Sequence, residues 1–205
     1  MVDESPVILI VSAASGTGKS SLSRALAQRC EDTIVSVSHT TRDRRSGEID
    51  GKDCYFVSQD RFAQMIGDDQ FAEHACVYGH YYGTSIETIR ASIDAGVNVV
   101  LDIDWQGAMQ VSKKFSEAVL VFLLPPSLQT LKQRLVRRGR DKGSVIEQRF
   151  AAAREDLAQC VRFDHLVLND DFELAFEELR GLVLSRKASI RPIPASILDD
   201  LGIAG

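Results

Sequence analysis

Residues 7–20 read Val7-Ile-Leu-Ile-Val11-Ser-Ala-Ala14-Ser-Gly16-Thr-Gly18-Lys19-Ser20, and this stretch decides the fold that the sequence predicts. Its first five residues form an apolar, β-rich run, which is typical of a strand buried on both faces of a parallel sheet. Apolar side chains then recur at helical spacing over residues 20–30, at Leu22, Ala25 and Leu26. The stretch is therefore expected to form a strand and a glycine-bearing loop, followed by a helix.

The loop from Ala13 to Ser20 matches the phosphate-binding pattern called a P-loop, with alanine in the first glycine position. Glycines let backbone N–H groups turn toward a phosphate, and the following helix adds its positive N-terminal dipole. Lys19 would reach the β- and γ-phosphates, and the Ser20 hydroxyl would reach Mg²⁺. The pattern predicts a nucleoside triphosphate bound with Mg²⁺, against the alternative of a flexible loop with a surface lysine. By itself it does not separate a kinase from an ATPase or a GTPase.

Beyond residue 85 the chain alternates predicted helices and strands, which is typical of an α/β sandwich with a parallel sheet. The predicted strands are 97–101, 118–124 and 165–168, and the predicted helices are 87–95, 128–137, 145–158 and 174–186. Residues 34–85 differ, because they combine short strands (34–38 and 54–57), turn signals and a short helix (61–66). We therefore expect a three-layer α/β core formed by 1–33, 86–136 and 149–205, a small mixed β flap over 34–85, and a helical lid over 137–148.

Composition indicates one globular domain with inserted segments. The chain has 205 residues and a mass of 22.6 kDa, with 44% hydrophobic and 26% charged residues. The net charge of −5 makes general binding to nucleic acid or to a membrane surface unexpected. No targeting or membrane segment is apparent. The four cysteines lack metal-site spacing, so we expect reduced thiols in a cytoplasmic protein.

Two groups of residues are candidates for phosphate and metal chemistry beside the P-loop. Asp102 ends an apolar strand, where a carboxylate can order a water on Mg²⁺, and Asp104 faces the same side if the strand geometry continues. Three arginines crowd four positions at 42, 44 and 45, and Arg forks bind phosphate bidentately. Solvated loop charge is the alternative, but with a P-loop present a second phosphate site explains the cluster better.

A third basic cluster surrounds the glycine-bearing polar stretch after residue 136. It contains Arg134, Arg137, Arg138, Arg140 and Arg149. In phosphoryl transfer, charge spreads over the transferring oxygens, and a positively charged lid can neutralise it and exclude water. Some of the five are expected to be ordinary helix-surface charge, and spacing does not separate these from the rest.

Five motifs, read in order along the chain, resemble the bacterial guanylate kinases. They are Ser36-Val-Ser38-His-Thr-Thr-Arg42 with Arg45 and Gly47-Glu48, Tyr81-Tyr82-Gly83-Thr84, Leu101-Asp102-Ile-Asp104-Trp-Gln-Gly107, Leu131 to Asp141 with Arg134 and Arg138, and Asn169-Asp170-Asp171. The resemblance runs without gaps from about residue 7 to 187. It implies transfer of the γ-phosphate of ATP to GMP, giving ADP and GDP in purine nucleotide recycling, by a P-loop core with a GMP-binding flap and a lid that both close.

The resemblance also implies roles for individual residues. ATP would be bound by Ala13, Ala14, Ser15, Gly16, Thr17, Gly18, Lys19, Ser20, Ser21 and, on the adenine side, Asn169. The GMP phosphate would be held by Arg42, Arg45 and Tyr82, and guanine would be read by Ser38, Glu73, Thr84 and Asp104. Catalysis would rest on Lys19, Arg134, Arg138 and Arg149, and Mg²⁺ on Ser20 and, through water, Asp102.

The carboxylates of Glu73 and Asp104 make chemical sense for guanine. The Watson–Crick edge of guanine offers two adjacent donors, N1–H and the 2-amino group, whereas adenine presents an acceptor at N1. A site that leaves buried polar groups unpaired with the wrong base can discriminate by about 10⁴-fold. A solvated surface acid is the alternative for Glu73.

Two positions depart from the family pattern. Ala14 stands where many relatives have proline, and Cys54 stands where relatives commonly have a tyrosine whose hydroxyl contacts the GMP phosphate. Tyr55 is next door, but a one-residue offset in a strand turns a side chain to the other face. The GMP phosphate is therefore expected to have one fewer protein contact.

Two other functions are weighed against the kinase. A non-catalytic domain that binds phosphopeptides would be expected to lose the ATP site, whereas Lys19, Ser20 and Asp102 are intact. A P-loop switch protein would not need a second phosphate site. The sequence leaves monomer and homo-oligomer equally open.

Overall fold

The computed structural model describes residues 5–77, 79–137, 143–185 and 189–203, which contain two β-sheets. The larger sheet has five parallel strands in the order β2-β7-β1-β8-β9. The strands are β1 (Ile8–Ala13), β2 (Thr33–Val35), β7 (Asn98–Asp102), β8 (Val119–Leu124) and β9 (His165–Leu168). The predicted α/β fold with a parallel sheet is confirmed.

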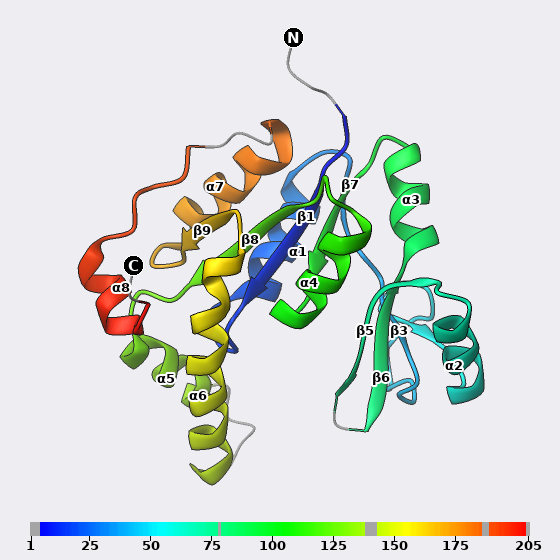
Figure 1. Ribbon diagram of the computed structural model, residues 1–205, viewed down its shortest axis with the longest axis horizontal. Coiled ribbons are helices and arrows are strands. Elements are labelled where there is room, and N and C mark those ends of the chain that lie inside the picture. Colours follow the sequence, from blue (N-terminus) through cyan, green and yellow to red (C-terminus); the bar gives the residue numbers. More distant parts are fainter. Residues whose placement is uncertain (1–4, 78, 138–142, 186–188, 204–205) are drawn as a thin grey trace.

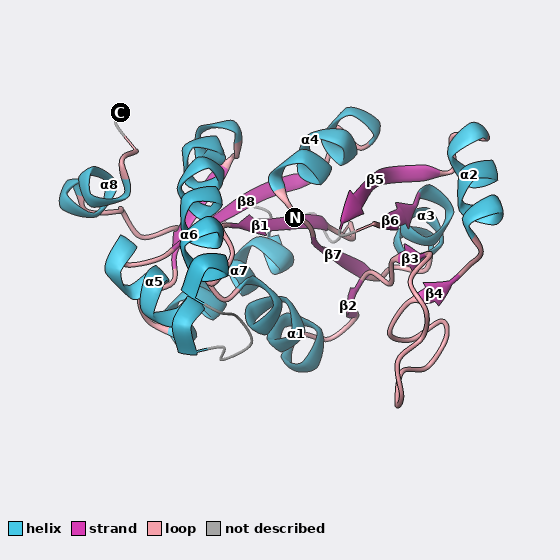
Figure 2. Cartoon of the chain, turned by 90° about the horizontal axis from the view of Figure 1, so that it is seen from below, coloured by secondary structure: helices cyan, strands magenta, loops and turns pink. Residues whose placement is uncertain are grey.

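Helices cover both faces of this sheet, as Figure 2 shows. Alternate side chains of β1 enter two different cores, Leu9 and Val11 on one face and Ile8 and Ile10 on the other. The first face packs against α1 (Lys19–Arg29) and α7 (Phe172–Ser185), and the second against α3 (Ile86–Asp94) and α4 (Trp105–Lys114). Further along the second face lie α5 (Leu128–Arg137) and α6 (Gly143–Leu157). Burial on both faces explains the uninterrupted apolar runs in the sequence.

The smaller sheet stands to one side of the core, together with α2 (Gln59–Gly67), as seen on the right of Figure 1. Its order is β4-β3-β6-β5, and it consists of β3 (His39–Thr40), β4 (Tyr55–Phe56), β5 (Phe71–Val77) and β6 (His80–Ser85). The antiparallel β5–β6 pair is its main part, and it sets Glu73 opposite Thr84. Buried Phe62 and Met65 of α2 pack on Phe71.

The strand predicted over 34–38 needs correction, because it ends at Val35 and belongs to the core. Thr33, Ile34 and Val35 pair in parallel with residues 98–100 of β7. Period-two alternation identifies a strand but does not show which sheet the strand joins. The prediction therefore placed the start of the smaller sheet at residue 34, whereas its first strand is β3. The β5–β6 pair and helix α4 were not predicted at all.

The C-terminal segment, weakly specified in the sequence, folds back onto the core. The 3₁₀ turn η1 (Ala158–Arg162) precedes β9, and α7 follows β9. The segment after α7 contains the short helix α8 (Ala195–Leu201). Leu201 and Ile203 are buried beside α5, and Asp200 accepts a hydrogen bond from the Leu128 backbone N–H at 2.9 Å. Within the described ranges, no helix combines the length and apolar character needed to cross a bilayer.

Candidate active site

The P-loop joins β1 to α1 and borders a cavity of about 270 Å³. Gly16 and Gly18 adopt φ values of 97° and 110°, a left-handed region that glycine enters without steric cost. Gly18 has a second constraint, because a Cβ there would lie 2.6 Å from Nδ2 of Asn169. The loop pattern therefore reflects both backbone conformation and close packing.

Two residues from distant elements hold the backbone of the P-loop. The buried Asn169, just after β9, donates from Nδ2 to the Thr17 carbonyl oxygen at 2.6 Å. Arg134 of α5 donates to the same oxygen at 3.1 Å and to the Asn169 carbonyl oxygen at 3.2 Å. Both were predicted to lie near ATP, and the structure brings both to the loop itself. In this conformation their polar groups support the loop.

Lys19 extends from the loop to the carboxyl end of β7. Its Nζ lies 2.7 Å from Oδ1 of Asp102 and donates to the Ile103 carbonyl oxygen at 2.8 Å. The strand-ending carboxylate predicted beside the P-loop is therefore paired with the P-loop lysine. Because the ion pair is only partly buried, a phosphate group can compete for Lys19 at modest cost.

A second cavity, also of about 270 Å³, adjoins the first. Four of the residues predicted to bind GMP line it, namely Ser38, Glu73, Tyr82 and Asp104. Its other lining residues are Asp102, Ala75, Val77 and Ile103. Asp104 lines both cavities, so the two cavities are neighbours at this residue. A wider, more open hollow of about 610 Å³ beside α3 contains none of the predicted site residues.

Glu73 is a buried carboxylate, with only 7% of the residue exposed. Its Oε1 accepts a hydrogen bond from Oγ1 of Thr84 at 2.7 Å, across the β5–β6 pair. Burial raises the pKa of the Glu73 carboxyl, the hydrogen bond from Thr84 lowers it, and the nearby Asp104 carboxylate raises it again. Burying a carboxylate is costly, so the burial of Glu73 indicates a binding role. Thr84, which is predicted to read the same guanine, orients the carboxylate through its hydrogen bond.

Asp104 is held by the helix that it starts. It is the N-cap of α4, and its Oδ1 accepts from the Gly107 N–H at 2.8 Å. A Cβ on Gly107 would lie 3.3 Å from both Asp104 Oδ1 and Glu73 Oε2. Gly107 thus lets α4 approach both carboxylates, a requirement that the motif contained but that sequence reasoning did not use.

The arginine cluster is organised by an acidic residue that sequence reasoning left without a role. Glu48 accepts from Nη1 and Nη2 of Arg42 at 3.1 and 2.8 Å, and from the Arg45 backbone N–H at 2.7 Å. Arg42 lowers the pKa of the Glu48 carboxyl. Glu48, and to a smaller extent the neighbouring Tyr82, raise the pKa of Arg42, and Tyr82 also lines the second cavity. The Arg45 side chain is exposed.

The remaining predicted residues differ in position. Arg149 of α6 donates from Nη2 to Oγ of Ser15 at 2.8 Å, so it reaches the P-loop. The Ser21 side chain is exposed, and the residue does not line the P-loop cavity. Residues 138–142 of the predicted lid, Arg138 among them, lie outside the described residues. One carboxylate was missed: Asp156 of α6 lines the P-loop cavity beside Ser20 and Asp104.

Cys54 lies just before β4 and Tyr55 begins it, and the two side chains have different surroundings. Tyr55 stacks on His39, with ring centroids 4.7 Å apart. Cys54 is half-buried, and burial raises the pKa of its thiol while the charge of Arg42 lowers it. Cys54 therefore lies near the arginine cluster, and Tyr55 packs within the smaller sheet.

A P-loop cavity that adjoins a second pocket lined by carboxylates, with Tyr82 of that pocket next to Arg42, defines a class of protein. It is a P-loop protein built to hold a nucleotide next to a second ligand that bears an anionic group. A family model for guanylate kinase matches residues 5–186. The chain belongs to the guanylate kinase family.

Individual relatives agree with this assignment. The chain is 50% identical to the guanylate kinase of Psychrobacter arcticus over 184 residues, which is 90% of this chain and 88% of that protein. It is 45% identical to the guanylate kinase of Legionella pneumophila (strain Paris), over 92% and 90% of the two chains. A crystal structure of guanylate kinase from Anaplasma phagocytophilum is similar over 100% of this chain and 99% of that one, with a TM-score of 0.68 and 28% identity.

Proposed function

We propose that this chain is an ATP:GMP phosphotransferase, which moves the γ-phosphate of ATP to GMP and gives ADP and GDP. One observation carries the proposal: Asp104 lines both the P-loop cavity and the cavity of Glu73. A transferase needs donor and acceptor phosphates next to each other, whereas an NTPase switch needs a single nucleotide pocket. Membership of the guanylate kinase family supports the same reading.

The acceptor base is proposed to bind between β5 and α4. Glu73 and Asp104 would accept hydrogen bonds from N1–H and the 2-amino group of guanine, with Ser38 and Thr84 beside them. Thr84 and Gly107 already engage one oxygen of each carboxylate, which fixes both acids before the base arrives. Fixed acceptors cost little entropy on binding, and with adenine they would face another acceptor.

The acceptor phosphate is proposed to bind at Arg42, Arg45 and Tyr82. Glu48 accepts hydrogen bonds from Nη1 and Nη2 of Arg42, which fixes the plane of that guanidinium. GMP needs no general base there, because the second pKa of a phosphate monoester is about 6 and its oxygen is already ionised at neutral pH. The protein then only has to position this oxygen and offset its charge.

The donor side fits ATP with Mg²⁺. The P-loop cavity is bordered by the Ser20 segment and the carboxylates of Asp104 and Asp156, all hard oxygen donors. Mg²⁺ in such sites uses one or two carboxylates together with nucleotide phosphates, and in kinases it offsets phosphate charge. Among the described residues no group of three or more His, Cys, Asp or Glu is placed to hold an ion alone, so the ion would arrive with the nucleotide. Ser20, and Asp102 through water, are the proposed ligands.

The transfer step follows from these positions. An oxygen of the GMP phosphate forms a bond to the γ-phosphorus, the bond from that phosphorus to the β–γ bridging oxygen breaks, and ADP leaves. Lys19 would leave its ion pair with Asp102 and contact the β- and γ-phosphates instead, which is a short move for a flexible side chain. Arg134 and Arg149 already touch the P-loop and would offset charge on the transferring oxygens.

A coupled assay for ADP release, run with GMP, dGMP, AMP and UMP in turn, tests the proposal. We expect ATP turnover to require a guanine monophosphate and to fall by orders of magnitude with AMP. ATP turnover without any monophosphate would support the switch reading instead, and absent ATP binding would support the phosphopeptide-binding reading. The cytoplasmic location expected from the sequence stays a prediction.

A further inference from the structure

Helix α6 presents two charged side chains to the P-loop. Arg149 and Asp156 are seven residues apart, which is about two helical turns and places both on one side of the helix. Arg149 contacts Ser15 of the loop, and Asp156 lines the loop cavity. The face of α6 opposite solvent, marked by buried Ala153 and Leu157, anchors the helix in the core. Asp156 is thus brought to the nucleotide cavity by a firmly packed helix.

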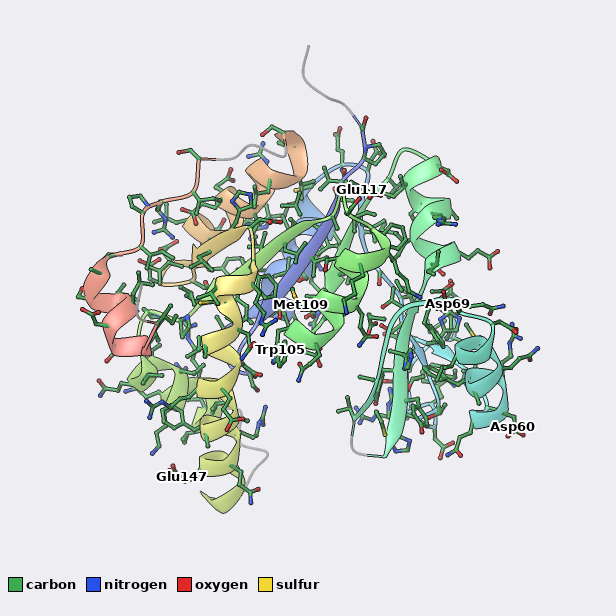
Figure 3. All side chains as sticks on the ribbon, in the orientation of Figure 1. Asp60, Asp69, Trp105, Met109, Glu117 and Glu147 are labelled. Atoms are coloured by element: carbon green, nitrogen blue, oxygen red, sulfur yellow. The ribbon has the colours of Figure 1, made fainter. Side chains whose placement is uncertain are left out.

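Asp156 also has a neighbour on a second element. Burial raises the pKa of the Asp156 carboxyl, and the neighbouring Trp105 side chain lowers it. Trp105 is the first residue of α4 and directly follows Asp104. In Figure 3 the labelled Trp105 lies between α4 and the ribbon of α6. An indole N–H can only donate and a carboxylate has about four acceptor positions, so the neighbouring Trp105 leaves most of the acceptor capacity of Asp156 open.

The residues around Asp156 indicate which ligand its free acceptor positions can bind. Asp102, the strand-ending acid, pairs with Lys19 and lines the other cavity, whereas Asp104 and Asp156 line the cavity that contains Ser20. Two carboxylates beside a hydroxyl on a phosphate-binding loop would repel the phosphates of a bare nucleotide. The same carboxylates would attract a hydrated divalent cation that the nucleotide carries.

We propose that Asp156 is a positioning residue for the metal–nucleotide complex, which holds water bound to Mg²⁺ of Mg·ATP and so ties α6 to the P-loop. The inference rests on the proposed function, and it names a residue outside the five motifs. It fits the donor set of this cavity, since Mg²⁺ gives up its waters reluctantly and is often held through them.

Calorimetric titration with ADP, once with Mg²⁺ and once with EDTA, tests the proposal without turnover. In Asp156→Asn, an amide oxygen still faces Trp105 but the charge is gone. We expect the gain in ADP affinity caused by Mg²⁺ to fall about tenfold, the lower end for groups that support metal ligands. The affinity in EDTA should stay equal or rise, because a repulsive charge has been removed.

Two further variants separate this role from a structural one. Trp105→Phe removes the neighbouring indole N–H and keeps the charge of Asp156, so it should retain most of the Mg²⁺-dependent gain. Asp156→Glu should recover part of the gain that Asp156→Asn loses. Equal losses in Mg²⁺ and in EDTA for Asp156→Asn, or a Trp105→Phe variant that reproduces its loss, would overturn the proposal while leaving the kinase assignment intact. A wild-type chain whose ADP affinity does not respond to Mg²⁺ would contradict the nucleotide site as well.

Discussion

Glu73 combines a binding role with a cost in stability. A carboxylate that is 7% exposed, accepts one side-chain hydrogen bond and lies near Asp104 is expensive to keep charged. Guanine would offset that cost by donating to it. The residue is thus expected to favour ligand binding over stability of the free protein.

Replacing Glu73 by glutamine should weaken GMP binding and stabilise the free protein. In Glu73→Gln we expect a higher KM for GMP and a lower GMP/AMP ratio of kcat/KM, because the amide can donate to adenine N1 and loses the charge that favours guanine. Steady-state kinetics with both nucleotides measure the ratio. An unchanged ratio would mean that Glu73 does not read the base.

The same variant should be more stable than the wild type, in a pH-dependent way. The folded state raises the pKa of Glu73, so the cost of its charge is absent below the unfolded-state pKa and appears as pH rises through the folded-state pKa. Glu73→Gln should therefore have the higher Tm at neutral pH, with the difference disappearing in acid. Thermal unfolding across pH measures it, and a Tm difference independent of pH would point to packing instead.

Cys54 is where this chain departs from the family pattern, and its place near Arg42 allows a direct test. A hydrogen bond to a charged group is worth about 1.5–3 kcal/mol, and a bridging water can recover much of that where a thiol is too short and too weak a donor. We expect Cys54→Tyr to gain about 1 kcal/mol, or roughly fivefold in GMP affinity, with ATP affinity unchanged. Calorimetry with GMP decides, since overpacking of the smaller sheet would make binding equal or weaker.

Individual site residues could be predicted to different degrees. Lys19, Asp102 and Asp104 follow from a local pattern, a P-loop and the end of an apolar strand, and the structure brings them together. The contacts of Asn169 and Arg134 with Thr17 join positions more than a hundred residues apart. No local pattern encodes such contacts, and the same holds for Asp156.

At the scale of elements, the β1–P-loop–α1 unit should tolerate loss of Lys19 structurally but not functionally. In Lys19→Ala we expect transfer to fall by at least about 10²-fold, the usual cost of removing one electrostatic contact to the reacting group. GMP affinity should stay nearly unchanged, because Asp102 remains partly exposed without its partner. Turnover beside GMP calorimetry checks both, and turnover within tenfold of wild type would contradict the P-loop role.

Elements were predictable where burial sets a pattern. The core strands are apolar on both faces, so β1, β7, β8 and β9 are evident in the sequence. The β5–β6 pair carries His, Glu, Tyr and Thr among its apolar residues, since one side of it lines a binding cavity, and its alternation is weak. Helix α8 has seven residues, and its stability comes from packing on α5, which sequence propensity does not report.

At the scale of the whole molecule, Arg191 fastens the C-terminal segment to the core. Its Nε donates to Oε1 of the buried Glu178 at 2.6 Å, and its Nη2 donates to the Leu168 carbonyl oxygen at 2.9 Å. Asp170 adds a third contact at 3.2 Å. The guanylate kinase model ends at residue 186, so Arg191 lies beyond the part of the chain that the family model covers, whereas its three partners lie within it.

Removing that attachment should be costly. Breaking a fully buried ion pair costs about 3–5 kcal/mol, and since Arg191 is one-third exposed we expect Arg191→Ala to lose about 2–3 kcal/mol. Urea unfolding measures the loss. Arg180→Ala is the matched control, because it breaks an exposed pair with Glu177 and should cost less than about 0.5 kcal/mol. Similar losses of unfolding free energy in both variants would show that the Arg191 contacts stabilise the chain no more than an exposed ion pair does.

The junction of β7 and α4 has a consequence for the geometry of transfer. Within six residues it supplies the two partners of Lys19, the shared Asp104, and the Gly107 that lies against Glu73. The separation between the donor and acceptor sites is thereby set by one short stretch of continuous backbone from Asp102 to Gly107. Base preference can then be altered through β5 and β6 without changing the reach over which the phosphoryl group travels.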